Sequence, residues 1–171
     1  MVITKKDNFS ICHICGKYAP MTREHVPPKS AFNKSTQKLL TGRNLQRLVA
    51  SQYYPWEYPH VKIKDVKKVH MQGGIHYYSL CVDCNNHKTG HWYAPSYSDF
   101  IIKSYIYTQS IIKSNEMEAN KYYEYSIKSV YPLRIIKQIF AMFCSINPIQ
   151  LSQYDNNLIR EFILYRDSKF F

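Results

Sequence analysis

The chain has 171 residues, of which 45% are hydrophobic, and it carries a formal net charge of +11. This length and composition predict one domain with a hydrophobic core, or a small domain with an extension. The sequence has neither an apolar run of about 18 residues nor the apolar segment of a signal peptide. These features argue against a membrane-spanning or secreted chain, and we expect a cytoplasmic protein.

Positive charge is concentrated in the N-terminal half. Residues 1–92 carry fourteen Lys and Arg against five Asp and Glu, whereas residues 93–171 carry nine against seven. A field of this kind attracts polyanions, of which nucleic acid is the natural one. A merely solvated, lysine-rich surface is the alternative interpretation.

The first part of the chain is expected to contain a metal-binding turn and a strand. Residues 1–11 are polar and predict a short lead-in. Residues 12–17 read C-H-I-C-G-K, a C-x-x-C turn that Gly16 allows to close tightly. Residues 22–26 favour a strand, which the following Pro-Pro ends.

A polar and aromatic insert follows at 33–73. Within it, the leucine spacing of 37–50 predicts a helix interrupted by Gly42, and the segment Q-Y-Y-P-W-E-Y-P-H predicts a loop. Alternation between Val61 and His70 predicts an exposed strand. Residues 75–80 predict another strand, which leads into a second C-x-x-C motif.

Helical patterns dominate the rest of the chain. One helix is expected to begin near Cys84, and a second covers residues 97–113. Pro132 is suited to the first position of a third helix, which reaches about Ile146. Asp155 is predicted to cap a last helix. Residues 122–130 alternate at period two and predict a strand.

Two C-x-x-C motifs, Cys12/Cys15 and Cys81/Cys84, are separated by 65 residues. In a reducing compartment such pairs indicate metal rather than disulfides. Four thiolates complete the tetrahedral coordination of zinc, and a zinc ion held in this way has no open position for a substrate. We therefore predict a structural Zn²⁺ that joins the two segments.

Chemistry-bearing residues lie beside both motifs. Glu24 and His25 stand at the end of the predicted strand, and Asn85 directly follows the second motif. A Glu-His dipeptide is unspecific by itself. Its position ten residues after Cys15, together with the partner segment C-x-x-C-N-x-x-K-T, makes it specific.

The motifs C-x-x-C-G, T-R-E-H-V-P-P-K-S and C-x-x-C-N-N-H-K-T, in this order, resemble those of the HNH endonuclease family in its zinc-ribbon-bearing branch. The resemblance implies an α+β fold: a ββα-metal nuclease core with a four-cysteine structural zinc site in residues 1–92. A mainly helical extension, residues 93–171, would pack on that core. The implied function is metal-dependent hydrolysis of DNA phosphodiester bonds, with RNA not excluded, in a setting such as phage defence, restriction or a mobile element.

The resemblance also implies roles for individual residues. His25 would be the general base, Glu24 and Asn85 would hold a catalytic Mg²⁺ or Mn²⁺, and Lys88 would contact the phosphate. His87 is a third candidate ligand. The chemistry is coherent, because a neutral histidine with an ordinary pKa of about 6.5 can accept a proton from water. A hard divalent ion on oxygen ligands can neutralise the developing charge.

One position departs from the family pattern. The asparagine that usually precedes the second C-x-x-C motif by five residues is replaced by His76. Either His76 takes over that role through a ring nitrogen, or it is an ordinary strand histidine. Asn44 is an alternative, although it lies far away in the sequence.

The insert mixes lysines and arginines with aromatic residues. Cations neutralise phosphates and aromatic rings stack on unpaired bases, so the insert is predicted to contribute to nucleic-acid binding. Alternatively, its aromatics form a small satellite core. The candidate nucleic-acid-binding residues of the whole chain are Arg23, Lys29, Arg43, Arg47, Lys62, Lys64, Lys67 and Lys68.

Two other functions remain open. The chain is then either a zinc-stabilised nucleic-acid-binding module that does not cleave, or an interaction protein whose zinc organises a helical scaffold. In each case the C-terminal helices pack on the core or mediate assembly into a homodimer or a larger complex.

Overall fold

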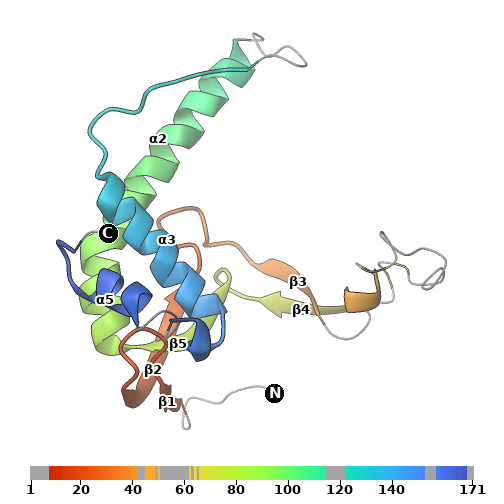
Figure 1. Cartoon of the computed structure of the whole chain (residues 1–171). Coiled ribbons are helices and arrows are strands. Elements are labelled where there is room, and N and C mark those ends of the chain that lie inside the picture. The colour runs from red at the N-terminus through yellow and green to blue at the C-terminus, as the bar shows by residue number, and fades with distance from the viewer. Residues whose placement is uncertain are drawn as a thin grey trace. The chain divides into compact units, whose positions relative to one another are not determined.

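The computed structural model describes residues 8–41, 45–48, 50, 62, 64, 66–114, 122–152 and 157–168. The chain forms two compact units, and Figure 1 follows it from end to end. Unit 1 comprises residues 1–33 and 76–171, and unit 2 comprises residues 34–75. The segment from residue 93 onwards therefore belongs to the same unit as both C-x-x-C motifs.

Unit 1 contains a three-stranded antiparallel sheet with the order β1-β2-β5. Its strands are β1 (Phe9–Ile11), β2 (Tyr18–His25) and β5 (His76–Cys81). The strands predicted at 22–26 and 75–80 are thus confirmed, while the predicted lead-in contains a strand, β1. The pairing of β2 with β5 runs from Met21 opposite Cys81 to His25 opposite His76.

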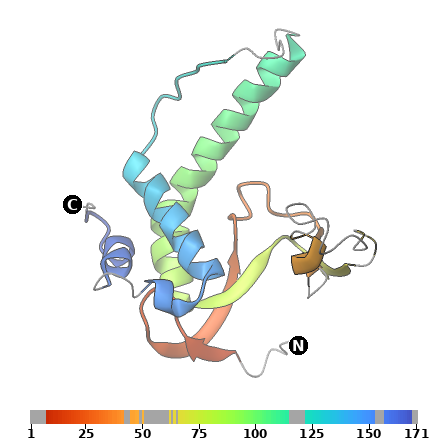
Figure 2. The same ribbon diagram turned by 45° about the vertical axis from the view of Figure 1, so that its right-hand side comes forward.

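Helices follow the sheet in unit 1. They are η2 (Asp83–Tyr93), α2 (Ala94–Lys113), α3 (Pro132–Ile146), α4 (Ile149–Ser152) and α5 (Leu158–Leu164). Prolines stand in the first turns of α2 and α3, where the missing N–H costs no hydrogen bond. Figures 1 and 2 show α3 running beside α2, and α3 also contacts η2, α5 and β5. The predicted helices at 97–113 and 132–146 are confirmed.

The main core of unit 1 surrounds the cysteines. Its buried residues are Cys12, Ile14, Met21, Leu80, Cys81, Cys84, Tyr93, Ala141, Cys144 and Ile163. They come from the first C-x-x-C turn, the sheet, η2, α3 and α5. The C-terminal helices are therefore part of the same packed body as the cysteine cluster.

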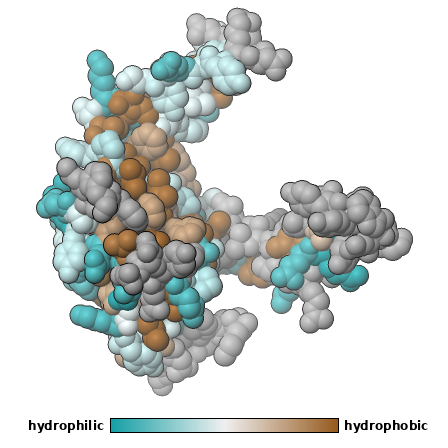
Figure 3. Space-filling model, in the orientation of Figure 1, coloured by the Kyte–Doolittle hydropathy of each residue, from teal (hydrophilic) through white to brown (hydrophobic). Residues whose placement is uncertain are grey.

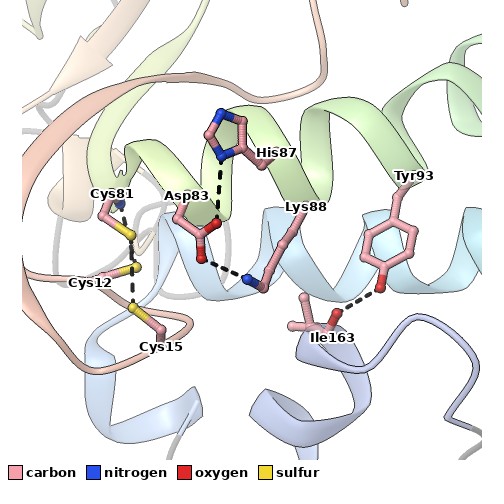
Figure 4. Close-up of polar contacts among 8 residues, drawn as sticks. All are labelled: Cys12, Cys15, Cys81, Asp83, His87, Lys88, Tyr93 and Ile163. Carbon is pink, nitrogen blue, oxygen red and sulfur yellow. Dashed lines mark hydrogen bonds and ion pairs between the residues drawn. The ribbon is translucent and has the colours of Figure 1, made fainter.

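Arg160 of α5 attaches the C-terminal helix to the first C-x-x-C turn. Its Nε donates to the carbonyl oxygen of Ile14 at 2.6 Å, and its Nη2 donates to the carbonyl oxygen of Cys15. Tyr93 donates its hydroxyl hydrogen to the carbonyl oxygen of Ile163 at 2.7 Å (Figure 4). Charged donors satisfy carbonyl groups that a turn leaves without backbone partners.

A second cation, Lys137 of α3, supports the end of α5. Its side chain is fully buried, and Nζ donates to the carbonyl oxygens of Phe162 and Tyr165 and to Ser168 Oγ. Burial lowers the pKa of this lysine, because desolvation disfavours the charged form. The three acceptors offset that effect at a helix end, where carbonyl groups have no partners within the helix.

Unit 2 contains a two-stranded antiparallel sheet in place of part of the predicted helix. Residues 37–41 form β3 (Gln37–Thr41), and among the described residues of the predicted 37–50 helix, 45–48 and 50 are helical. β3 pairs along its whole length with β4 (Lys67–Met71). The leucine spacing was misleading because strand pairing with a distant segment outweighs a weak local periodicity. Residues 67–70 of the strand predicted for 61–70 lie in β4, whereas Lys64 is in a 3-10 turn.

The predicted strand at 122–130 is wrong. These residues have no regular structure, and none of the described strands pairs with them. Instead, Tyr125 stacks on Tyr107 of α2 with ring centroids 4.3 Å apart. Period-two spacing produces a strand only where a neighbouring strand satisfies the backbone groups.

Several predictions fall on residues outside the described part of the chain. These are the aromatic loop segment 52–60, Arg43, Asn44 and Asp155. The predicted nucleic-acid-binding cations of the insert that the structure describes are exposed: Arg47, Lys62, Lys64, Lys67 and Lys68.

Hydrophobic side chains gather along α2 and α3 in the face that Figure 3 shows. Ile106 of α2 and Ile139 of α3 are among the exposed hydrophobic residues. None of the helices in the described ranges combines the length and apolar character needed to cross a lipid bilayer.

Candidate functional site

The four cysteines of the two C-x-x-C motifs form one cluster. All four Sγ atoms lie within 4.8 Å of one another, and Cys15 Sγ lies 3.8 Å from Cys81 Sγ. A tetrahedral zinc ion with bonds of about 2.3 Å holds its sulfur atoms roughly 3.8 Å apart. The cluster therefore has the composition and size of a four-cysteine zinc site, and Figure 4 shows three of its members side by side.

The surroundings favour a thiolate at Cys12, whereas burial raises the pKa of Cys15. A hydrogen bond from Cys84 lowers the pKa of Cys12 to about 4, with help from backbone groups, and the same bond raises the pKa of Cys84. The backbone N–H of Cys81 donates to Cys12 Sγ at 3.4 Å. Without a metal ion, Cys12 and Cys84 share a proton in this hydrogen bond. A metal ion displaces such thiol protons when it binds.

Local backbone structure closes the first C-x-x-C turn. Gly16 N–H donates to the carbonyl oxygen of Cys12 at 2.8 Å, and Gly16 has φ +72°, which favours glycine. A Cβ at this position would also come within 2.6 Å of Arg160 Nη2. The N–H of His13 donates to the carbonyl oxygen of Ser79 at 2.9 Å, which ties the turn to β5.

Beside the cluster, one pocket collects three of the four predicted catalytic residues. Glu24, His25 and Asn85 line the same pocket, whose volume is about 240 Å³. Glu24 and His25 end β2, while Asn85 lies in the first turn of η2. Segments about sixty residues apart in the sequence therefore meet beside the cysteine cluster.

Asn85 joins η2 to β2. Its Nδ2 donates to Thr22 Oγ1 at 2.8 Å and to the carbonyl oxygen of Arg23 at 3.1 Å, while Thr22 Oγ1 donates to the carbonyl oxygen of Leu80 at 3.0 Å. Because both amide hydrogens are used in this way, Oδ1 is the atom of Asn85 that can bind a cation. The side chain is only 8% exposed, so its position is well determined by packing.

Glu24 is the buried carboxyl group of the pocket. Only 5% of the residue is exposed, and desolvation raises its pKa to about 8. A nearby cation would restore the charged form, because an opposite charge offsets the loss of water. The Glu24 carboxylate and the Asn85 oxygen are hard ligands, of the type that Mg²⁺ and Mn²⁺ prefer.

The raised pKa of Glu24 predicts how stability changes with pH. Below its ordinary pKa of 4.5 the carboxyl is neutral in both the folded and unfolded states, whereas between 4.5 and about 8 only the unfolded state ionises. The wild-type protein therefore loses stability as the pH rises towards 8. The stability of Glu24→Gln, which cannot ionise, should therefore rise relative to that of wild type as the pH increases from 4.5 to about 8. We expect this relative gain to total about 3–5 kcal/mol at pH 8 and not to grow further above it.

Denaturant unfolding at a series of pH values, with zinc present and no other divalent ion, measures this difference. Glu161→Gln on α5 is the matched control, since Glu161 is exposed. If the difference in unfolding free energy between Glu24→Gln and wild type were the same at all pH values, the raised pKa of Glu24 would be contradicted.

His25 lies opposite His76 in the β2–β5 pairing, and their ring centroids are 5.6 Å apart. His76 in turn contacts Tyr78 edge-on, with centroids 5.9 Å apart. His76 thus lies directly beside the predicted general base, at the position where the resemblance expects an asparagine.

The described lining of the pocket does not include Lys88 or His87. Lys88 Nζ lies 2.6 Å from Asp83 Oδ2, and the exposed His87 lies 3.6 Å from Asp83 Oδ1 (Figure 4). The reason is the pitch of η2, which is a π-helix. Its wide i→i+5 turn aligns Lys88 with Asp83, whereas the narrower α-helical turn would bring Lys88 closer to the face of Asn85.

Gly90 makes this wide turn possible. A Cβ at Gly90 would lie 2.7 Å from the carbonyl oxygen of Asn85, too close for the backbone to remain in place. We expect Gly90→Ala to destabilise the protein by about 1–3 kcal/mol and to displace Asn85. Thermal unfolding measures the loss, with His91→Ala at the next, exposed position as the control. Equal melting temperatures for the two variants would contradict the predicted clash.

Other pocket residues come from the same two segments. Arg23 and Lys29, both predicted as nucleic-acid contacts, line the pocket with exposed side chains. Asn86 and Thr89 also line it and were not predicted as site residues, although both lie within the motif C-x-x-C-N-N-H-K-T. Thr89 Oγ1 donates to the carbonyl oxygen of Asn85 at 2.9 Å.

The described residues of unit 1 thus form an α+β structure with a small antiparallel sheet, packed helices and a four-cysteine cluster that could hold a zinc ion. Comparisons with known protein families, with curated proteins and with solved structures found no match to this chain. The function is therefore inferred from the residues of the site.

Proposed function

We propose that this protein is a metal-dependent endonuclease of the HNH type, which hydrolyses phosphodiester bonds in DNA. The observation that carries the proposal is the pocket shared by Glu24, His25 and Asn85. These residues offer a base and two oxygen ligands next to two exposed cations. A protein that only binds nucleic acid has no need for this combination.

The order of elements around the pocket supports a ββα-metal core. β2 and β5 are antiparallel neighbours, and η2 follows β5 directly. The cysteine cluster joins the start of β2 to the start of η2, and Asn85 adds two hydrogen bonds between them. A zinc ion in the cluster would therefore hold the helix in register with the end of β2.

The proposed reaction is attack by water on the phosphorus atom, with cleavage of the P–O3′ bond. His25 accepts a proton from the attacking water at a ring nitrogen. Glu24 and Asn85 would hold one Mg²⁺ or Mn²⁺, and such an ion would supply charge neutralisation for the phosphate and the leaving oxygen. Arg23 and Lys29 attract the DNA backbone to the pocket through their positive charge.

Lys88 takes no part in this proposal. Its ammonium group pairs with Asp83, so the role in phosphate binding implied by the family resemblance would pass to Arg23 and Lys29. The exposed cations of unit 2 remain candidates for contacts with nucleic acid.

A zinc-stabilised module that binds nucleic acid without cleaving it is the second candidate. The positions of Lys88 and His87 favour this binding function. Neither residue is in the described lining of the pocket, so the pocket lacks the predicted phosphate contact and the third candidate metal ligand. Cleavage distinguishes the two functions.

The test is incubation of the purified protein with supercoiled plasmid in the presence of Mg²⁺ or Mn²⁺. We expect conversion to open-circular or linear DNA, which gel electrophoresis detects. Binding of the plasmid without cleavage of any DNA or RNA, with either ion, would support the binding module instead.

A further inference from the structure

A second pocket lies in unit 1, next to the one that holds Glu24 and His25. Its volume is about 510 Å³, and its lining includes Phe9, Pro20, Arg23 and Tyr78. These residues come from β1, β2 and β5, so the pocket lies on the three-stranded sheet. Arg23 lines both pockets and therefore marks the point where they adjoin.

A continuous row of side chains leads from the proposed general base to this second pocket. From His25 the row passes to His76 at 5.6 Å and to Tyr78 at 5.9 Å, measured between ring centroids. The Tyr78 hydroxyl then accepts hydrogen bonds from Arg23 Nε and Nη2, both at 3.4 Å. Arg23 and His25 are alternate residues of β2, and His76 and Tyr78 are alternate residues of β5, so each pair can share one face of its strand. The β2–β5 register shifts between Thr22 and Glu24, which includes the position of Arg23.

Phe9 supplies the aromatic surface of the pocket. It is 57% exposed and lies opposite Pro20 in the pairing of β1 with β2. Its ring contacts Tyr18, with centroids 5.8 Å apart. An exposed phenyl ring and a guanidinium group in the lining of one pocket match the two parts of a nucleotide, since the ring can stack on a base and the cation can bind the phosphate.

We propose that this second pocket binds an unpaired nucleobase adjacent to the scissile phosphodiester, so that the substrate is single-stranded nucleic acid or a duplex with unpaired nucleotides. Phe9 stacks on the base, Arg23 binds the phosphate between the two pockets, and Tyr78 positions Arg23. A base inside a duplex is stacked on its neighbours and reaches such a pocket only after it is extruded. The inference rests on the proposed function, which identifies the phosphodiester beside this pocket as the one that is cleaved.

Binding measurements on full-length protein test the pocket without cleavage. All proteins carry His25→Ala so that bound DNA stays intact, and the probes are a fluorescent oligothymidine and a fluorescent, fully paired, blunt-ended duplex, each followed by anisotropy. We expect tighter binding of the oligothymidine. Phe9→Ala should weaken it about tenfold, because stacking contributes this much per base, and should leave duplex binding within about twofold.

Matched variants show whether the ring itself is responsible. Phe9→Leu keeps an apolar side chain without an aromatic face and should behave like Phe9→Ala, even if the alanine variant folds poorly. Tyr131→Ala removes an exposed aromatic ring elsewhere in the chain, which lies 4.8 Å from the guanidinium carbon of Arg134. This control should change the affinity for neither probe. Circular dichroism confirms that each variant is folded.

The results separate the subsite from the nuclease. Equal effects of Phe9→Leu and Tyr131→Ala, or equal affinities of the starting protein for both probes, would overturn the proposed subsite even if plasmid cleavage is observed. Selective loss of oligothymidine binding in Phe9→Leu supports the subsite, and it does so even if the wild-type protein fails to cleave, in which case only the nuclease proposal is lost.

Discussion

Replacement of His25 by alanine is expected to lower the rate of DNA cleavage by about 10²- to 10⁴-fold while leaving the protein folded. This range is the usual contribution of a positioned general base. His25 lies at the end of β2 and lines the pocket with Glu24 and Asn85, so its loss removes the proton acceptor from an otherwise unchanged site. Single-turnover cleavage of plasmid with saturating Mn²⁺ measures the effect on the chemical step.

The matched control for this experiment is His91→Ala. His91 is exposed, lies on η2 and is absent from the described lining of the pocket. We expect its cleavage rate to equal that of wild type. Cleavage by His25→Ala at the wild-type rate would remove His25 from the mechanism, and it would leave Glu24 and Asn85 as ligands without an assigned base.

Replacement of Cys84 by serine is expected to abolish both zinc binding and the fold of unit 1. A four-cysteine zinc site contributes on the order of 10 kcal/mol of apparent binding free energy, which equals or exceeds the net stability of a typical domain. Here the cluster lies inside the main core, in contact with α3 and α5. Loss of the metal therefore affects the C-terminal helices as well as the sheet.

Zinc content by mass spectrometry and folding by circular dichroism measure this effect together. Cys144→Ala is the matched control, because Cys144 is equally buried and lies outside the four-cysteine cluster. We expect this variant to keep one zinc ion and to lose only the stability of a small core truncation. A folded Cys84→Ser protein with the wild-type melting temperature would contradict a structural role for the metal.

Local patterns in the sequence predicted the parts of unit 1 that depend on short-range chemistry. The cysteine motifs predicted a cluster because each pair needs only a tight turn around Gly16 or the start of a helix. The strand at Glu24 and His25 was predicted from its composition and from the prolines that end it. The helix beginning at Pro132 was predicted from the position of its proline and from its apolar periodicity.

Features that depend on distant partners were not predicted. The leucine spacing of residues 37–41 suggested a helix, but pairing with β4 makes them a strand. The alternation of residues 122–130 suggested a strand, but none of the described strands pairs with them. In both cases backbone hydrogen bonding to another segment, or its absence, decided the structure.

The candidate site divides in the same way. The sequence by itself determined which residues could act, since Glu24, His25, Asn85 and the four cysteines are recognisable from their types and spacing. Only the tertiary structure decided how they are arranged. The π-helical turn, which Gly90 permits, directs Lys88 to Asp83, and the strand register sets His76 beside His25. The physical reason is that a side chain's direction depends on helix pitch and strand register. The register follows from pairing between distant segments, and the pitch of η2 follows from the close approach of backbone that Gly90 allows.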